Sequence, residues 1–106
     1  MTVFKLFFKI SPIVKFQIKE ESMYPFLKPG DFVLVNKLAV SFKINDLVIL
    51  KNPENSKQYL VKKIKEIRNG KYFVIGENKN KSRDSRYYGW VNRENIIGKV
   101  FKILNS

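Results

Sequence analysis

Hydrophobic and polar residues alternate along much of this chain with the period of two that is typical of half-buried β-strands. The first clear run covers residues 14–20, in which Val14, Phe16 and Ile18 alternate with polar residues. Further strands are predicted at residues 32–36, 47–50, 58–68, 71–76, 90–91 and 97–104. No long stretch has the period of a helix, so the pattern predicts an all-β fold, a small mixed or antiparallel β-barrel-like core without long helices.

Turn residues separate these runs. Pro29-Gly30 lies in a predicted turn at residues 28–31, and residues 52–56 are rich in turn formers. Asn69-Gly70 predicts a two-residue hairpin. Residues 77–86 are predicted to form a polar loop, whereas residues 37–44 show no clear pattern.

The length of 106 residues and the apolar share of 44% are sufficient for one domain with one core. We assign this domain to residues 13–106 and treat residues 1–12 as a separate apolar and basic segment. Its apolar run, residues 3–10, is well short of the about 20 residues that span a bilayer. Lysines interrupt the run, which argues against a signal peptide. The segment is therefore either amphipathic and membrane-interfacial, or a first strand or frayed end.

The formal charge of +12 favours an anionic partner, either nucleic acid or a membrane surface rich in anionic lipid. We expect a protein that is peripheral to a membrane or cytoplasmic, with no transmembrane helix in this chain. The sequence contains no cysteine and no histidine. This excludes disulfides, a cysteine nucleophile, a Cys/His zinc site and a Ser-His-Asp triad, and we expect no metal and no other cofactor.

Ser22 is the first candidate for chemistry. It precedes Met23, Tyr24 and the rigid Pro25, so it is predicted to lie on a fixed bend. Without histidine, a nucleophilic serine needs another base, and lysine is the natural candidate. The competing interpretation is an ordinary loop serine.

Lys62 is the second candidate. It shares one face of its strand with Leu60 and Ile64, because side chains alternate along a strand. Burial on that face lowers the pKa of a lysine, and a neutral lysine can act as a general base. The competing interpretation is a surface lysine in a lysine-rich strand.

The polar loop supplies the third group of residues. Asp84 and Arg86 can form an ion pair that holds the loop, and Ser82 can hydrogen-bond a nearby amine. The competing interpretation is a solvated loop with an incidental ion pair.

Together these blocks resemble the type I signal peptidase family of serine endopeptidases. Residues 22–27 with Gly30-Asp31 match its Ser-Met-x-Pro block and the following Gly-Asp turn, and residues 45–50 match its next strand loosely. Residues 59–64 match its lysine block, and residues 76–91 match its Ser-x-Asp-Ser-Arg block, so the resemblance covers residues 16–99.

The resemblance implies a role for each matching residue. Ser22 is the expected nucleophile, its N–H a donor to the oxyanion, and Lys62 the expected general base. Ser82 is expected to orient the lysine, with Asp84 and Arg86 as a supporting ion pair. The residues expected to bind substrate as an added strand are Phe16, Ile18, Met23 and Tyr24.

The implied function is removal of an N-terminal leader or signal peptide from a preprotein, after small residues and through an acyl-enzyme. The chain also departs from the family. Glu20 replaces a Gly or Ser that helps to form the oxyanion hole in some members, and Phe26 replaces a Thr. We expect this chain to be without the membrane helix and the extra β-rich insertion of typical members. In this the chain is similar to short proteases proposed to mature nickel-type superoxide dismutase.

Three other interpretations remain. A self-cleaving LexA-type repressor domain shares the Ser–Lys dyad but lacks the Ser-x-Asp-Ser-Arg block. A basic β-barrel that binds nucleic acid accounts for the charge but not for the ordered motifs, so nucleic acid is the weaker partner assignment. An inactive family relative is the third, because Glu20 lies close to the expected oxyanion hole. The sequence predicts neither the oligomeric state nor the identity of the substrate.

Overall fold

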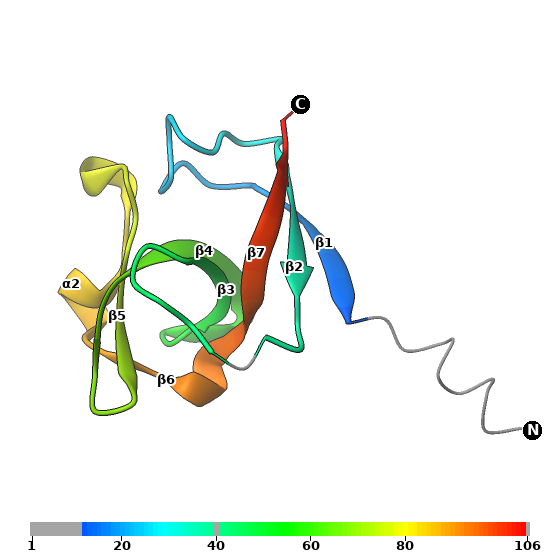
Figure 1. Ribbon diagram of the computed structural model, residues 1–106. Coiled ribbons are helices and arrows are strands. Elements are labelled where there is room, and N and C mark those ends of the chain that lie inside the picture. The colour runs from blue at the N-terminus through cyan, green and yellow to red at the C-terminus, as the bar shows by residue number, and fades with distance from the viewer. Residues whose placement is uncertain (1–11, 40, 106) are drawn as a thin grey trace, which may run out of the picture.

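A computed structural model describes residues 12–39 and 41–105 (Figure 1). Seven strands form one sheet within this part of the chain. They are β1 (Ile13–Gln17), β2 (Phe32–Asn36), β3 (Leu47–Asn52), β4 (Asn55–Arg68), β5 (Lys71–Ile75), β6 (Val91–Asn92) and β7 (Ile96–Leu104). Three short helical turns accompany them: η1 (Lys79–Lys81), α2 (Ser85–Tyr88) and η2 (Arg93–Asn95).

The sheet has the order β1-β2-β7-β3-β4-β5-β6, and every neighbouring pair is antiparallel. The last strand, β7, therefore lies between β2 and β3 and joins the two halves of the sheet. The sheet curves strongly, so that β4 and β5 lie opposite the β1-β2-β7 side (Figure 1). The prediction of an all-β fold without long helices is confirmed.

The predicted strands agree with the observed ones except near turns and loops. β2 has the predicted bounds, and the hairpin after β4 has positive φ at both Asn69 and Gly70, as a type I′ turn requires. β1 ends at Gln17, before the predicted end, because the Ile18 backbone bonds to the turn at Gly30-Asp31 instead. The predicted polar loop at residues 77–86 contains η1 and the start of α2.

Two hydrophobic clusters fill the two sides of the curved sheet. Leu60 and Ile64 of β4 belong to the first cluster, together with residues of β3, β5, β6 and β7. Val61, on the opposite face of β4, belongs to the second cluster with Ile18, Met23 and Leu27. The middle of β4 is therefore buried on both faces, which is unusual for a strand that carries a lysine there.

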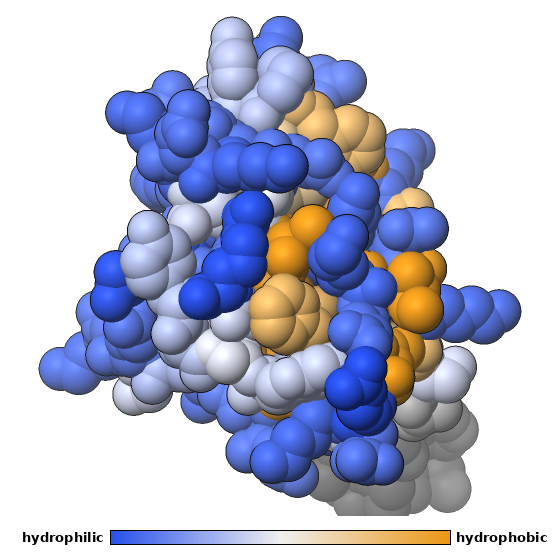
Figure 2. Space-filling view, turned by 90° about the vertical axis from the view of Figure 1, so that its left-hand side faces the viewer, coloured by the Kyte–Doolittle hydropathy of each residue, from blue (hydrophilic) through white to orange (hydrophobic). Residues whose placement is uncertain are grey.

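The face shown in Figure 2 is mostly hydrophilic, with apolar side chains near the centre, to the right of it and towards the top. Among the described residues, no helix is long and apolar enough to cross a membrane. The assignments made to residues 1–11 of the N-terminal segment lie outside the part of the chain that the structure describes.

A substitution of Gly98 tests how closely β7 packs against β2. A Cβ atom at this residue would lie 2.5 Å from the Asn36 carbonyl oxygen and 2.8 Å from Cγ1 of Val35. We expect Gly98→Ala to lower the free energy of unfolding by about 1–3 kcal/mol, because the backbone of β2 has to shift. Chemical denaturation of both proteins measures the difference.

Lys102→Ala, on an exposed position of the same strand, is the control and should change stability little. Equal stability of Gly98→Ala and the unmodified protein would mean that β7 does not pack against β2 this closely.

Candidate active site

Ser22 lies in the loop between β1 and β2, and three sets of contacts hold that loop in place. The side chains of Met23 and Leu27 are buried beneath it and anchor it to the second hydrophobic cluster. Inside the loop, the Leu27 N–H donates to the Met23 carbonyl oxygen at 2.9 Å. Across the site, the Asn78 N–H donates to the Ser22 carbonyl oxygen at 2.8 Å. The serine is therefore fixed on a bend, as predicted.

Lys62 lies in the middle of β4, opposite Val48 of β3, and is the largest fully buried side chain among the described residues. Its side chain is 1% exposed. The Lys62 Nζ donates to Ser82 Oγ at 3.3 Å and lies 3.7 Å from Glu20 Oε1. The predicted inward orientation of this lysine is confirmed, and the surface-lysine interpretation is wrong.

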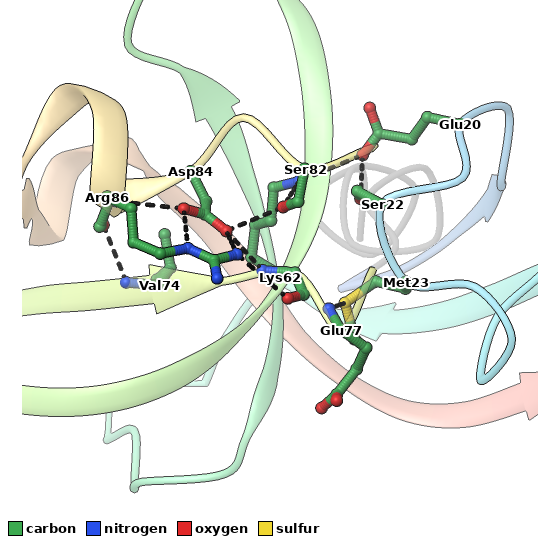
Figure 3. Close-up of polar contacts among 11 residues, drawn as sticks. Glu20, Ser22, Met23, Lys62, Val74, Glu77, Ser82, Asp84 and Arg86 are labelled. Atoms are coloured by element: carbon green, nitrogen blue, oxygen red, sulfur yellow. Dashed lines mark hydrogen bonds and ion pairs between the residues drawn. The ribbon is translucent and has the colours of Figure 1, made fainter. Parts of the chain in front are cut away.

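Glu20 connects the serine to the lysine (Figure 3). The Ser22 hydroxyl donates a 2.8 Å hydrogen bond to Glu20 Oε1, the same oxygen that faces Lys62. The sequence identified Glu20 only as a departure from the family pattern. The sequence did contain a signal for the contact of Glu20 with Ser22 and Lys62. A carboxylate lies two residues before the serine, and the candidate base is a lysine, which attracts a carboxylate.

Asp84 organises the loop that covers Lys62. Its side chain is completely buried and accepts hydrogen bonds from Ser82 Oγ at 2.8 Å, from the Gly76 N–H at 2.8 Å and from Arg86. The closest Arg86 contact joins Nη2 to Asp84 Oδ2 at 2.6 Å. A continuous chain of hydrogen bonds thus runs from Lys62 through Ser82 to Asp84 and Arg86, which brings the predicted supporting residues together (Figure 3).

Two residues of this loop contribute in ways that the sequence analysis did not assign. The buried Ser85 hydroxyl accepts a 2.9 Å hydrogen bond from the Val74 N–H and ties α2 to β5. Gly76 has no room for a side chain, because a Cβ atom there would overlap the Ser82 side chain and the Ser22 carbonyl oxygen. The absence of a side chain at residue 76 is what lets these two segments approach.

The electrostatics of the two central ionisable groups differ. Burial lowers the pKa of Lys62 below its usual value, and the carboxylates of Glu20 and Asp84 oppose this shift. Burial by itself raises the pKa of Asp84, but hydrogen bonds from Arg86, the Gly76 N–H and Ser82 outweigh it and bring that pKa to about 2. Asp84 is therefore ionised at every physiological pH, whereas Lys62 is more easily neutralised than an ordinary lysine.

A groove of about 440 Å³ leads to Glu20. Residues 16–20 form one wall, residues 57–61 form the other, and Ile49 lies between them. In the described region, Phe16 and Gln17 of β1 pair only with β2, and residues 59–61 of β4 pair only with β3, so each wall offers a backbone edge that no described strand pairs with. The groove therefore has the shape and the hydrogen-bonding groups to take an extended peptide.

The residues expected to bind substrate lie in different surroundings. Phe16 and Ile18 line the groove, and the Phe16 ring packs against Tyr59 with centroids 5.5 Å apart. Met23 is buried in the second cluster, where its sulfur accepts from the Glu77 N–H at 3.4 Å. Tyr24 is 44% exposed. Neither Met23 nor Tyr24 lines the groove.

Metal ligation is not supported by the side chains that the structure describes, since no three Asp, Glu, His or Cys residues among them gather around one point.

A substitution of Asp84 tests how much the hydrogen-bond network contributes to the stability of the protein. Asp84→Asn should lower the free energy of unfolding at neutral pH by about 2–3 kcal/mol, because Arg86 loses its buried counter-ion. The depressed pKa of Asp84 means that its contribution is complete above its unfolded pKa of about 3.9 and is lost as the pH falls through about 2. The difference between the two proteins should therefore narrow in acid, as urea titrations from pH 7 to pH 2 can measure.

Glu54→Gln is the matched control, because it removes one carboxylate from the exposed Glu54–Arg83 pair. Exposed pairs contribute little, so its stability should follow that of the unmodified protein. A constant difference for Asp84→Asn across this pH range would show that Asp84 does not act through its charge.

Two comparisons with known proteins identify a family. The family model described as signal peptidase, peptidase S26 matches residues 1–67 and 64–104. A signal peptidase I from Aquifex aeolicus (strain VF5) is 57% identical over 37 residues, which cover 35% of this chain and 14% of the relative. A signal peptidase I from Buchnera aphidicola subsp. Acyrthosiphon pisum is 49% identical over 37 residues, 35% of this chain and 12% of the relative.

The chain thus matches only a small part of the length of these relatives, whereas the family model covers almost all of the chain. The predicted resemblance is confirmed: this protein belongs to the signal peptidase family, peptidase S26.

Proposed function

We propose that this protein is a serine endopeptidase that removes an N-terminal leader peptide from a preprotein, with Ser22 as nucleophile and Lys62 as general base. The observation that carries the proposal is the burial of the Lys62 amine beside the hydroxyl of Ser82 and the carboxylate that also holds Ser22. A lysine buried to this degree is costly, and such groups gather at sites of chemistry.

The reaction begins with proton transfer. The Ser22 hydroxyl turns from Glu20 toward the neutral Lys62 amine, which takes its proton while Oγ attacks the carbonyl carbon of the scissile bond. The Ser22 N–H, which donates to none of the described residues, is available to the oxyanion that forms. The Lys62 ammonium then protonates the leaving amine, the C–N bond breaks, and the leader stays bound as an ester of Ser22.

Water completes the cycle. Lys62, neutral again, accepts a proton from a water molecule as its oxygen attacks the ester carbonyl. The proton returns to Ser22 Oγ as the ester bond breaks and the leader leaves with a free carboxyl group. Ser82 keeps the amine in position through both half-reactions, because its own hydroxyl is fixed by the ionised Asp84.

The groove supports an extended peptide as substrate. A strand lying between residues 16–20 and 57–61 can bond to the backbone of these two walls, and its scissile bond then approaches Glu20 and Ser22 at the end of the groove. The apolar part of the lining, which includes Phe16 and Ile18, suits the apolar residues of a leader peptide.

Ser22→Ala tests the nucleophile. We expect kcat/KM for a leader-bearing peptide to fall by roughly 10⁴-fold or more, because no other hydroxyl takes the place of the serine. The variant should retain the stability of the unmodified protein, since the change removes a single oxygen atom. Mass spectrometry of the products, together with thermal unfolding, checks both expectations. Turnover that persists in Ser22→Ala would remove this residue from the mechanism.

Lys62 and Lys63 form a matched pair for the base. The activity of the unmodified protein should rise with pH through an apparent pKa below the about 10.4 of an ordinary lysine, because burial favours the neutral amine. Lys62→Met should be folded and inactive at every pH, since Met fills the apolar site without a basic nitrogen. Measurements of the cleavage rate across the alkaline pH range test the unmodified protein, Lys62→Met and Lys63→Met.

Lys63→Met should keep most of the activity, because the Lys63 side chain is partly exposed and pairs with Glu77 instead. The reverse result, an inactive Lys63→Met and an active Lys62→Met, would mean that the base lies on the other face of β4 and that our assignment of Lys62 is wrong.

A further inference from the structure

Glu20 occupies a position that the proposed mechanism does not use. Its Oε1 atom accepts the Ser22 hydroxyl at 2.8 Å and lies 3.7 Å from Lys62 Nζ. Ser22 is 2% exposed and the Lys62 side chain is 1% exposed, whereas the Glu20 side chain is 32% exposed. Glu20 is therefore the only one of the three groups that can turn into solvent without opening the core.

The observed arrangement is chemically unproductive in three ways. The hydroxyl proton of Ser22 points to a carboxylate rather than to the amine that has to receive it. The same carboxylate favours the ammonium form of Lys62, and an ammonium group cannot act as a base. In addition, a carboxylate next to Ser22 repels the negative charge that develops on the carbonyl oxygen of a substrate.

The groove gives a reason for Glu20 to move. Glu20 is the last residue of one groove wall, so a peptide that fills the groove up to Ser22 meets its carboxylate. We propose that Glu20 is a positioning residue that holds Ser22 and Lys62 in a resting arrangement, and that a peptide entering the groove displaces it into solvent and frees both groups to react. This inference rests on the proposed endopeptidase function.

The charged groups around Lys62 indicate that Glu20 is the group whose displacement changes the charge of the lysine. From the loop of residues 76–86 and α2, Asp84 and Arg86 form an ion pair, and their opposite charges act on the lysine in opposite directions. From β3, Val48 presents an apolar side chain. The nearby Tyr88 hydroxyl stays neutral, because burial raises the pKa of that phenol. Only Glu20 brings a carboxylate that has no cation of its own other than Lys62 among the described residues.

Removing the charge of Glu20 tests this arrangement. Glu20→Gln keeps the size of the side chain and an oxygen that accepts from Ser22, but it no longer favours the ammonium form of Lys62. The pH dependence of kcat/KM reports the free enzyme, and that of kcat reports the enzyme–substrate complex. Each profile has a rising limb, the pH range over which the constant increases as the base loses its proton. In the unmodified protein, we expect the rising limb of kcat/KM to lie at higher pH than the rising limb of kcat.

In Glu20→Gln, the kcat/KM limb should move to lower pH and approach the kcat limb. At neutral pH, where the base is mostly protonated, kcat/KM should then rise about tenfold for each pH unit by which the limb moves. The kcat limb should move much less, because the substrate has already displaced Glu20.

Glu21→Gln is the matched control. It makes the same change of charge one residue away, where the carboxylate is exposed and lies 4.0 Å from Lys81. Both limbs of this variant should coincide with those of the unmodified protein.

A second measurement does not depend on turnover. NMR titration of the Lys62 side chain in the free protein, assigned by comparison with Lys62→Met, should give a lower pKa in Glu20→Gln than in the unmodified protein or in Glu21→Gln. This measurement tests the coupling between Glu20 and Lys62 separately from the proposed endopeptidase function. If the lysine titration shifts but no peptide is cleaved, the proposed function is wrong and the Glu20–Lys62 coupling stands.

Two results would overturn the inference about Glu20. Loss of activity at every pH in folded Glu20→Gln would mean that the carboxylate is itself the base for Ser22. Unchanged pH profiles together with an unchanged Lys62 titration would mean that Glu20 is a passive neighbour of both residues.

Discussion

The burial of one amine sets the requirements that the rest of the site meets. Lys62 lies in the part of β4 that is packed on both faces, where an unpaired ammonium group is expensive. Its nitrogen therefore needs polar partners from outside the sheet, and these are Ser82 from the loop that follows β5 and Glu20 from the loop between β1 and β2. The loop that follows β5 can close over β4 only because Gly76 has no side chain to separate Ser82 from the Ser22 segment.

The two carboxylates near the amine differ in a way that suggests different tasks. Asp84 is completely buried and saturated with hydrogen bonds from Ser82, Gly76 and Arg86, so its position and its charge are fixed. Glu20 accepts one hydrogen bond, is one-third exposed and lies at the end of a groove. A saturated, buried anion is suited to hold a site together, whereas a partly solvated anion can leave at little cost.

Local pattern was sufficient to predict most of the strands but not their order. The alternation in residues 32–36 and the Asn69-Gly70 turn act over a few residues, so both could be read from the sequence. The inward orientation of Lys62 followed from the same alternation. The insertion of β7 between β2 and β3 depends on pairing between distant segments, which no local pattern encodes. The contact of Glu20 with Lys62 was missed for the same reason.

The position of Glu20 links the state of the lysine to the occupancy of the groove. In the free protein, the partly solvated carboxylate compensates an ammonium group on Lys62. A peptide in the groove displaces the carboxylate and also excludes water from residues 57–61 of β4, next to Lys62, and each of these changes disfavours the ammonium form. The same binding event therefore turns the serine hydroxyl toward the amine and makes the amine basic. A site of this kind becomes reactive only when the bond to be cleaved is already in place.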